Sequence, residues 1–106
     1  MQLRYPAEID AHLSFAALEN TPVTITVDGE SFGGHIGFSD TFGTVNLFTQ
    51  GATVVIPETE IRASYQVGNQ VLQFVTRVVQ SMGNRWQLRR PRNISVTYTD
   101  SADFQN

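Results

Sequence analysis

The segment Val23 to Val27 constrains the fold of this chain more than any other. Its residues, Val-Thr-Ile-Thr-Val, alternate apolar and hydroxyl side chains with a period of two, which is typical of a strand with one buried face. Asp28-Gly29 follows as a two-residue turn, and residues 30–38 return as a second strand. The sequence therefore predicts an antiparallel β-hairpin.

Further short segments have strand character and are separated by turns. The expected strands cover residues 44–49, 52–56, 60–66, 70–80, 86–89 and 93–98. The segment 70–80 is the longest, and its valines and Phe74 populate both faces, which favours a central strand or a closed barrel. Glycines at 33, 34 and 37 predict a bulge, a barrel corner or a close approach to the second strand.

One helix is expected in front of these strands, over residues 7–19. Ile9, Leu13 and Ala16 recur at helical spacing, and Asn20-Thr21-Pro22 stops the helix. Short strands about ten residues apart favour a small antiparallel β-barrel over a parallel α/β fold. The 106 residues suit a single domain. We expect a mainly β domain of six to seven strands, with the barrel over 22–99 and a frayed tail over 100–106.

Cysteine is absent from the sequence, which excludes disulfides, a thiolate nucleophile and thiolate metal ligands. A reducing cytoplasm is therefore the expected compartment. The N-terminus has no apolar signal region, and no apolar run is long enough to span a bilayer. We expect no membrane insertion.

The basic residues are all arginine, and they are clustered. Residues 77–99 hold five arginines and no acid, whereas residues 1–76 hold two arginines and eight acids. A net charge of −3 argues against general nucleic-acid binding, which usually needs a basic domain. A local group of planar, permanently charged guanidinium groups instead suits one small anionic ligand.

The residues that could support catalysis form no recognisable constellation. His12 and His35 are the only histidines, and neither lies in a nucleophile motif or at a metal-ligand spacing. Glu58 and Glu60 follow Pro57 closely and are interpreted as an exposed edge. A phosphate loop would need a Walker lysine, and the chain has none. We expect no enzyme, no metal site and no cofactor.

The arginine-rich segment is the candidate ligand site. Arg85 and Arg89 are four residues apart, and Trp86 between them could stack on a base. The candidate ligand-binding residues are Arg85, Arg89, Arg90 and Arg92. The alternative is an edge strand whose arginines are solvated or pair with the acidic remainder of the protein.

The order of elements resembles a known family. A helix, Thr21 to Ile25, a return strand, two more strands, Val71 to Val79 and Leu88 to Arg92 follow the pattern of the N-terminal domain of YcgR-type flagellar-brake proteins, often called PilZN. This resemblance implies a PilZ-like split β-barrel. In that family an RxxxR motif and a downstream [D/N]xSxxG motif clamp cyclic di-GMP, and Arg85 and Arg89 match RxxxR in spacing. Residues 93–98 have Asn and Ser correctly spaced, but Tyr98 where Gly belongs.

The resemblance implies a non-catalytic bacterial module in second-messenger control of motility or surface behaviour, with cyclic di-GMP as the candidate ligand. One alternative is a protein-interaction or dimerisation domain that binds no nucleotide and uses edge strands or the helix. Another is single-stranded nucleic-acid binding on a barrel face, against which the acidic total charge argues.

Overall fold

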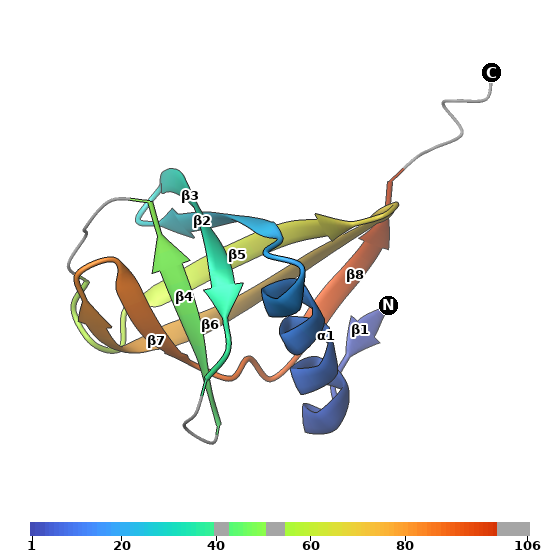
Figure 1. Ribbon diagram of the computed structural model, residues 1–106, viewed down its shortest axis with the longest axis horizontal. Coiled ribbons are helices and arrows are strands. Elements are labelled where there is room, and N and C mark those ends of the chain that lie inside the picture. The colour runs from blue at the N-terminus through green and yellow to red at the C-terminus, as the bar shows by residue number, and fades with distance from the viewer. Residues whose placement is uncertain (40–42, 51–54, 100–106) are drawn as a thin grey trace.

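The structure is a computed structural model that describes residues 1–39, 43–50 and 55–99. That part of the chain contains one helix, α1 (Pro6–Leu18), which follows the short strand β1 (Gln2–Leu3) (Figure 1). The other strands are β2 (Pro22–Val27), β3 (Glu30–Gly37), β4 (Thr44–Thr49), β5 (Glu60–Val67), β6 (Gln70–Met82), β7 (Arg85–Arg89) and β8 (Ile94–Tyr98). α1 therefore begins and ends one residue earlier than the expected helix over residues 7–19.

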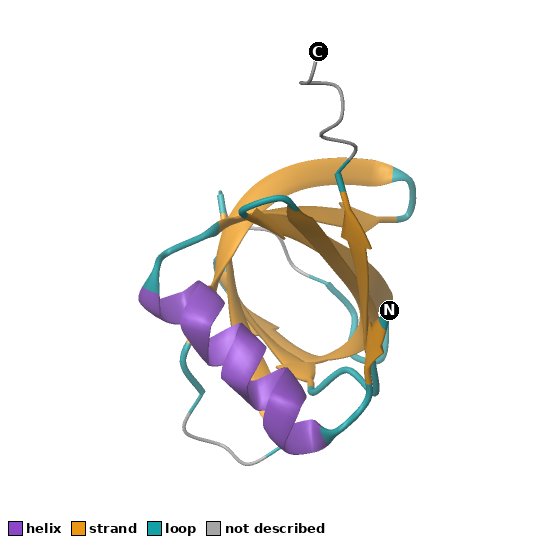
Figure 2. Cartoon of the chain, turned by 90° about the vertical axis from the view of Figure 1, so that its right-hand side faces the viewer, coloured by secondary structure: helices purple, strands orange, loops and turns teal. Residues whose placement is uncertain are grey.

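Six of the strands close into an antiparallel barrel. Their order around the ring is β6, β5, β2, β3, β4 and β7, and β7 pairs again with β6. β8 and β1 extend the sheet beyond the ring, on the free side of β6. Figure 2 looks along this ring and shows α1 lying across its edge. The expected mainly β barrel is confirmed, and the described residues contain eight strands, of which the two-residue β1 gave no sequence signal.

The long strand β6 is where the barrel splits. One side of it pairs with β5 over residues 70–77. On its other side, residues 70–73 pair with β8 and residues 78–82 pair with β7. Residues 74–77 pair with neither strand on that side, and the Thr76 hydroxyl instead donates to the carbonyl oxygen of Arg89 at 2.7 Å. The connection from β7 to β8 crosses this opening.

The alternating pattern in β2 buries one face, as the sequence predicts. Val23 and Ile25 are buried, while Thr24 is exposed. The turn at Asp28-Gly29 has φ values of 50° and 82°, which is the geometry that two-residue hairpins require. Residues 68–69 form a second two-residue turn, in which only the first residue, Gly68, has a positive φ, of 60°. Local chemistry therefore fixes both hairpin registers.

α1 supplies the rest of the core. Its Ile9, Leu13 and Ala16 side chains are buried with those of the strands. The helix stops where the sequence predicts, since Asn20 has a positive φ of 53° that α-helical geometry does not allow. Because the apolar stripe faces the barrel, α1 is held mainly by hydrophobic packing.

The expectation that the 70–80 segment is buried on both faces is wrong. Leu72, Phe74 and Val78 are buried, whereas Val75 is 43% exposed. A barrel wall has one face toward the core and one toward solvent, so apolar residues on the outer face remain exposed. The apolar content of this strand did not distinguish the two faces.

Two further expectations concern residues near the gaps in the description. Of the expected 52–56 strand, residues 52–54 lie outside the described residues, and Val55 and Ile56 belong to no strand. The expected tail over 100–106 also lies outside the described residues. Of the three alternatives for the β3 glycines, Gly34 shows the close approach, to the backbone of β4. A register shift typical of a bulge lies elsewhere, between Val78 and Gln80 in β6.

Tyr65 is an unusual core residue. It is 4% exposed, and among the described residues its hydroxyl is the buried side-chain polar atom that has no hydrogen-bond partner. Burial raises the pKa of Tyr65 to about 12. The fold therefore favours the neutral phenol. Burying the Tyr65 hydroxyl without a hydrogen-bond partner lowers the stability of the folded protein.

Replacing Tyr65 by phenylalanine is expected to raise the free energy of unfolding by about 1 kcal/mol, because an unsatisfied buried hydroxyl is removed. The unfolded phenol ionises from a pKa of 10.0 and the folded one near 12, so wild-type stability falls as the pH rises through this window. Urea denaturation of both proteins at pH 7 and pH 11 checks both effects. A Tyr65→Phe protein with the same alkaline loss as the wild type would contradict this account.

Candidate anion-binding site

A groove of about 810 Å³ lies on the outer surface of β5 and β6, beside the connection from β7 to β8. Five arginines line it together with two glutamates. We call it the arginine groove; its charged residues are Arg62, Arg77, Arg89, Arg90, Arg92, Glu58 and Glu60. Its floor includes Phe74 and Thr76, which belong to the split in the barrel. Positive charge therefore exceeds negative charge at the point where the wall of the barrel opens.

Strand register explains how these arginines meet. In the β5–β6 pair, Arg62 lies opposite Val75 and Glu60 lies opposite Arg77, all on the outer face. Arg89 is the last residue of β7, and residues 90–93 then cross toward β8. Arginines from β5, β6, β7 and the connection that follows β7 thus surround one groove.

The glutamates of the groove pair with two of its arginines. Arg89 donates from Nη2 to Glu58 Oε2 at 2.7 Å, and Arg77 Nη2 lies 4.0 Å from Glu60 Oε1. Arg77 also donates from Nη1 to the carbonyl oxygen of Glu58 at 3.1 Å. The hydrogen bond from Arg89 holds the pKa of the Glu58 carboxyl below its usual value, and the same bond raises the pKa of Arg89. Both groups are therefore charged at neutral pH.

Arg90 makes the most specific ion pair of the groove. Its Nε and Nη2 donate to the two carboxylate oxygens of Asp10 on α1, at 2.8 Å and 2.9 Å. This two-bond geometry is the one by which arginine also holds phosphate. In this structure Asp10 therefore occupies two donors of Arg90 that could otherwise bind an oxyanion with two acceptor oxygens.

Arg62 and Arg92 differ from the other three arginines. Within the described part of the chain, neither side chain makes an ion pair or a hydrogen bond. Both are exposed at the groove. Their charges are not matched by a carboxylate of the described residues, which leaves the groove with an excess of positive charge.

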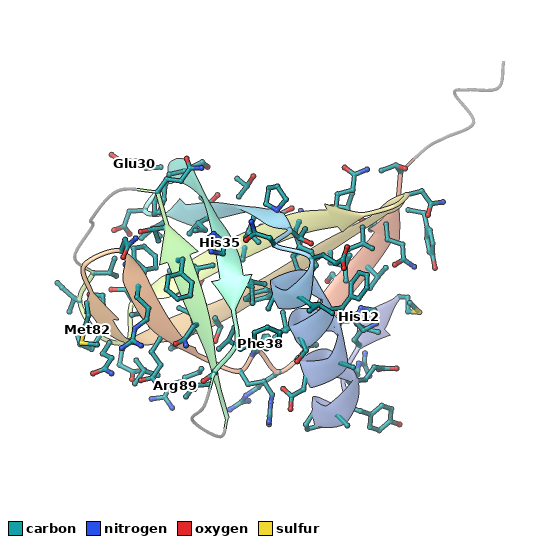
Figure 3. All side chains as sticks on the ribbon, in the orientation of Figure 1. His12, Glu30, His35, Phe38, Met82 and Arg89 are labelled. Atoms are coloured by element: carbon teal, nitrogen blue, oxygen red, sulfur yellow. The ribbon has the colours of Figure 1, made fainter. Side chains whose placement is uncertain are left out.

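The structure brings together three of the four predicted arginines. Arg89, Arg90 and Arg92 line the groove, but Arg85 does not. Arg85 begins β7 and pairs in register with Met82, about 13 Å along the strand from Arg89 at the usual rise per residue. Figure 3 labels Met82 and Arg89 and shows them at different places on the barrel. The alternative of an edge strand is wrong, because β7 pairs with β4 on one side and with β6 on the other. Its second part holds for Arg89 and Arg90, which pair with carboxylates of the protein, as Arg77 of β6 also does.

The sequence interpretation missed Arg62 and Arg77 as groove residues. A signal was present, because a two-residue turn at 68–69 sets Val67 opposite Gln70 and hence Arg62 opposite Val75. Counting outward from that turn places both arginines on one surface. Glu58 and Glu60 are exposed, as expected, and in addition line the groove.

The histidines lie away from the groove. His35 stacks on Phe48 of β4 with 5.3 Å between ring centroids, and His12 lies on α1 (Figure 3). Among the described residues, no group of three or more His, Cys, Asp or Glu side chains could hold a metal ion. No helix within those residues has the length and apolar character needed to cross a membrane.

Comparisons with known proteins agree with the barrel description. No family model matches the sequence, and no curated protein matches it. Among solved structures, the complex of K. pneumonia MrkH with c-di-GMP matches with a TM-score of 0.78 and 15% identity, over 92% of this chain. The YcgR-N domain of Escherichia coli YcgR matches with a TM-score of 0.72 and 12% identity, over 91% of this chain and 94% of that domain.

The two matches differ in extent. The chain spans 43% of the MrkH chain, but it corresponds to nearly the whole YcgR-N domain. The resemblance seen in the sequence is confirmed at the level of the fold, because the match to the YcgR-N domain extends over most of both chains. The chain therefore has the PilZ-like fold of the YcgR N-terminal domain.

Proposed function

We propose that this chain is a non-catalytic bacterial regulatory module that takes part in cyclic di-GMP sensing through the arginine groove. The observation that carries the proposal is the convergence of five arginines on one groove. The likeness to MrkH, whose structure is a complex with c-di-GMP, supports the choice of this anion. The cellular role we propose is control of motility or surface behaviour.

The chemistry of the groove suits a cyclic dinucleotide. Such a ligand carries two phosphates, and each can accept paired hydrogen bonds from one guanidinium group. Arginine planes also stack on bases, and arginine is the side chain that most often reads the O6 and N7 acceptors of guanine. A groove of about 810 Å³ has room for a ligand of this size.

The proposed contribution of this chain is limited to the arginines. Residues 93–98 carry Tyr98 at the position where the family's second motif has glycine. Glu58 and Glu60 also occupy part of the groove with negative charge, which a phosphate must overcome. We therefore expect weak binding that decreases with added salt.

Calorimetric titration with cyclic di-GMP tests the proposal. Arg92→Ala is expected to weaken binding about tenfold, because a charge-assisted hydrogen bond is lost. Arg89→Ala is expected to weaken it further, because Glu58 then loses its partner and repels the phosphate. The dissociation constant for cyclic di-GMP is measured for the wild type and each variant at one fixed salt concentration.

Variants of two arginines outside the groove distinguish binding in the groove from a general effect of positive charge. Arg4→Ala removes an exposed arginine that does not line the groove, so its dissociation constant should stay within twofold of the wild type. Arg85→Ala tests the RxxxR interpretation, since Arg85 lies outside the groove. If Arg85→Ala weakens binding as much as Arg89→Ala, the motif rather than the groove binds the nucleotide. No binding heat with the wild-type protein refutes the proposal.

One observation favours a second function, a dimerisation domain that binds no nucleotide. Phe15 and Leu18 lie on the outer side of α1 and are 49% and 69% exposed. A second copy of the chain could cover these side chains. Sedimentation across a hundredfold concentration range should then show a mass above that of the monomer, and Leu18→Asp should restore the monomer. A constant monomer mass excludes this function.

A further inference from the structure

Arg90 lies at the boundary between two hollows of the surface. On one side is the arginine groove. On the other is a pocket of about 410 Å³ between α1 and the ends of β3 and β4, which we call the helix pocket. Arg90 lines both, whereas Asp10 lines only the helix pocket. One guanidinium therefore connects the groove with the helix.

The contact between Arg90 and Asp10 is also distinctive for α1. The buried residues by which the helix packs on the barrel are apolar and include Ile9 and Leu13. Within the described residues, Asp10 makes the only ion pair from an α1 side chain to the strands or their connections. The backbone N–H of Arg90 is fixed to the carbonyl oxygen of Gly43 at 2.9 Å, so the side chain pivots from an anchored backbone.

A carboxylate and a phosphate present the same pair of acceptor oxygens to a guanidinium. Asp10 uses Nε and Nη2 of Arg90, which form one of the two edges by which a guanidinium group can make a two-bond contact with a phosphate. An anion in the groove that takes this edge must displace Asp10. This edge of Arg90 then binds either Asp10 or the anion, but not both. The free energy of anion binding therefore includes the loss of the ion pair with Asp10.

We infer that Arg90 transmits occupancy of the arginine groove to α1, because a bound anion and Asp10 compete for the same guanidinium edge. The inference rests on the proposed function and adds the contact through which ligand binding in the groove changes α1. In the free protein Asp10 holds Arg90 and the connection after β7 against the helix. In the bound protein Arg90 turns to the anion, and α1 keeps only its apolar contacts.

Asp10→Asn tests the competition, with Glu8→Gln as the matched control. Both changes remove one negative charge from the first half of α1, but Glu8 lines neither hollow. Two probes are titrated separately: inorganic pyrophosphate, which offers phosphates alone, and cyclic di-GMP. Asp10→Asn is expected to bind each probe about fivefold more tightly than the wild type, in the range of a modest coupling. Glu8→Gln should differ from the wild type by less than twofold.

Hydrogen exchange of α1 amides gives a second measurement. Saturating probe should speed exchange in α1 of the wild type severalfold, and the Asp10→Asn helix should exchange faster without probe and respond little to it. Equal affinities of Asp10→Asn and Glu8→Gln, or α1 exchange that saturating probe leaves unchanged, overturn the inference. Binding of pyrophosphate but not of cyclic di-GMP, with these effects present, refutes the proposed function and upholds the coupling. Absence of binding by either probe overturns both.

Discussion

Replacing Trp86 by alanine is expected to lower the free energy of unfolding by about 3–5 kcal/mol, the usual cost of deleting a buried aromatic ring. Trp86 is 0% exposed on the inner face of β7, so the expectation that it could stack on a base is wrong. Its ring meets that of Phe32 of β3 edge-on, with 5.6 Å between centroids. The loss leaves a cavity between two strands that are not neighbours in the sheet, since β4 lies between them. Urea denaturation at neutral pH measures the effect.

Two further variants show whether the loss comes from the cavity. Trp86→Phe keeps an aromatic ring in contact with Phe32, so its cost should be less than half as large. Met82→Ala changes a side chain that is 53% exposed on the neighbouring strand, and its effect should stay within about 0.5 kcal/mol. A cost below about 1 kcal/mol for Trp86→Ala would mean that the ring does not fill the barrel as described.

Replacing Gly34 by alanine is expected to lower the free energy of unfolding by about 2–3 kcal/mol, which is toward the upper end of the usual cost of overpacking a core. A Cβ atom at this position would lie 2.3 Å from the carbonyl oxygen of Phe48 and 2.8 Å from Cδ1 of Ile25. The carbonyl belongs to the backbone of β4, which is paired with β3 in this region. The two strands must therefore separate to admit a single methyl group. Denaturation curves of the wild type and the variant give the difference.

The neighbouring glycine is the matched control. A Cβ atom on Gly33 would meet first the end of the Gln50 side chain, at 3.1 Å, which can move aside. We expect Gly33→Ala to change the free energy of unfolding by less than about 0.5 kcal/mol. If both variants lose the same stability, the cost reflects a general requirement for glycine in β3 rather than the contact with Phe48.

The hairpins show how much of the fold can be read from local sequence. Period-two alternation in Val23 to Val27 and the turns at residues 28–29 and 68–69 predict paired strands whose register follows from the turn length. The structure has these pairings. The same reasoning, carried from the turn at 68–69, would have placed Arg62 and Arg77 on one surface.

The candidate site shows where local reasoning stops. The sequence shows that Arg85 and Arg89 are four residues apart, and in β7 residues four apart share a face of the strand. The spacing could not show that the groove begins at the far end of β7. Nor could it show that Asp10, eighty positions away in the sequence, holds Arg90.

The sequence by itself determined the class of fold, the ends of the helix and the presence of an arginine cluster in an acidic chain, since these depend on short-range periodicity, backbone preferences and composition. Only the tertiary structure decided which arginines share a groove and which carboxylates they meet. The physical reason is that β6 pairs with β8 over one part of its length and with β7 over another. The opening between those pairings is set by long-range strand order, which no local pattern encodes.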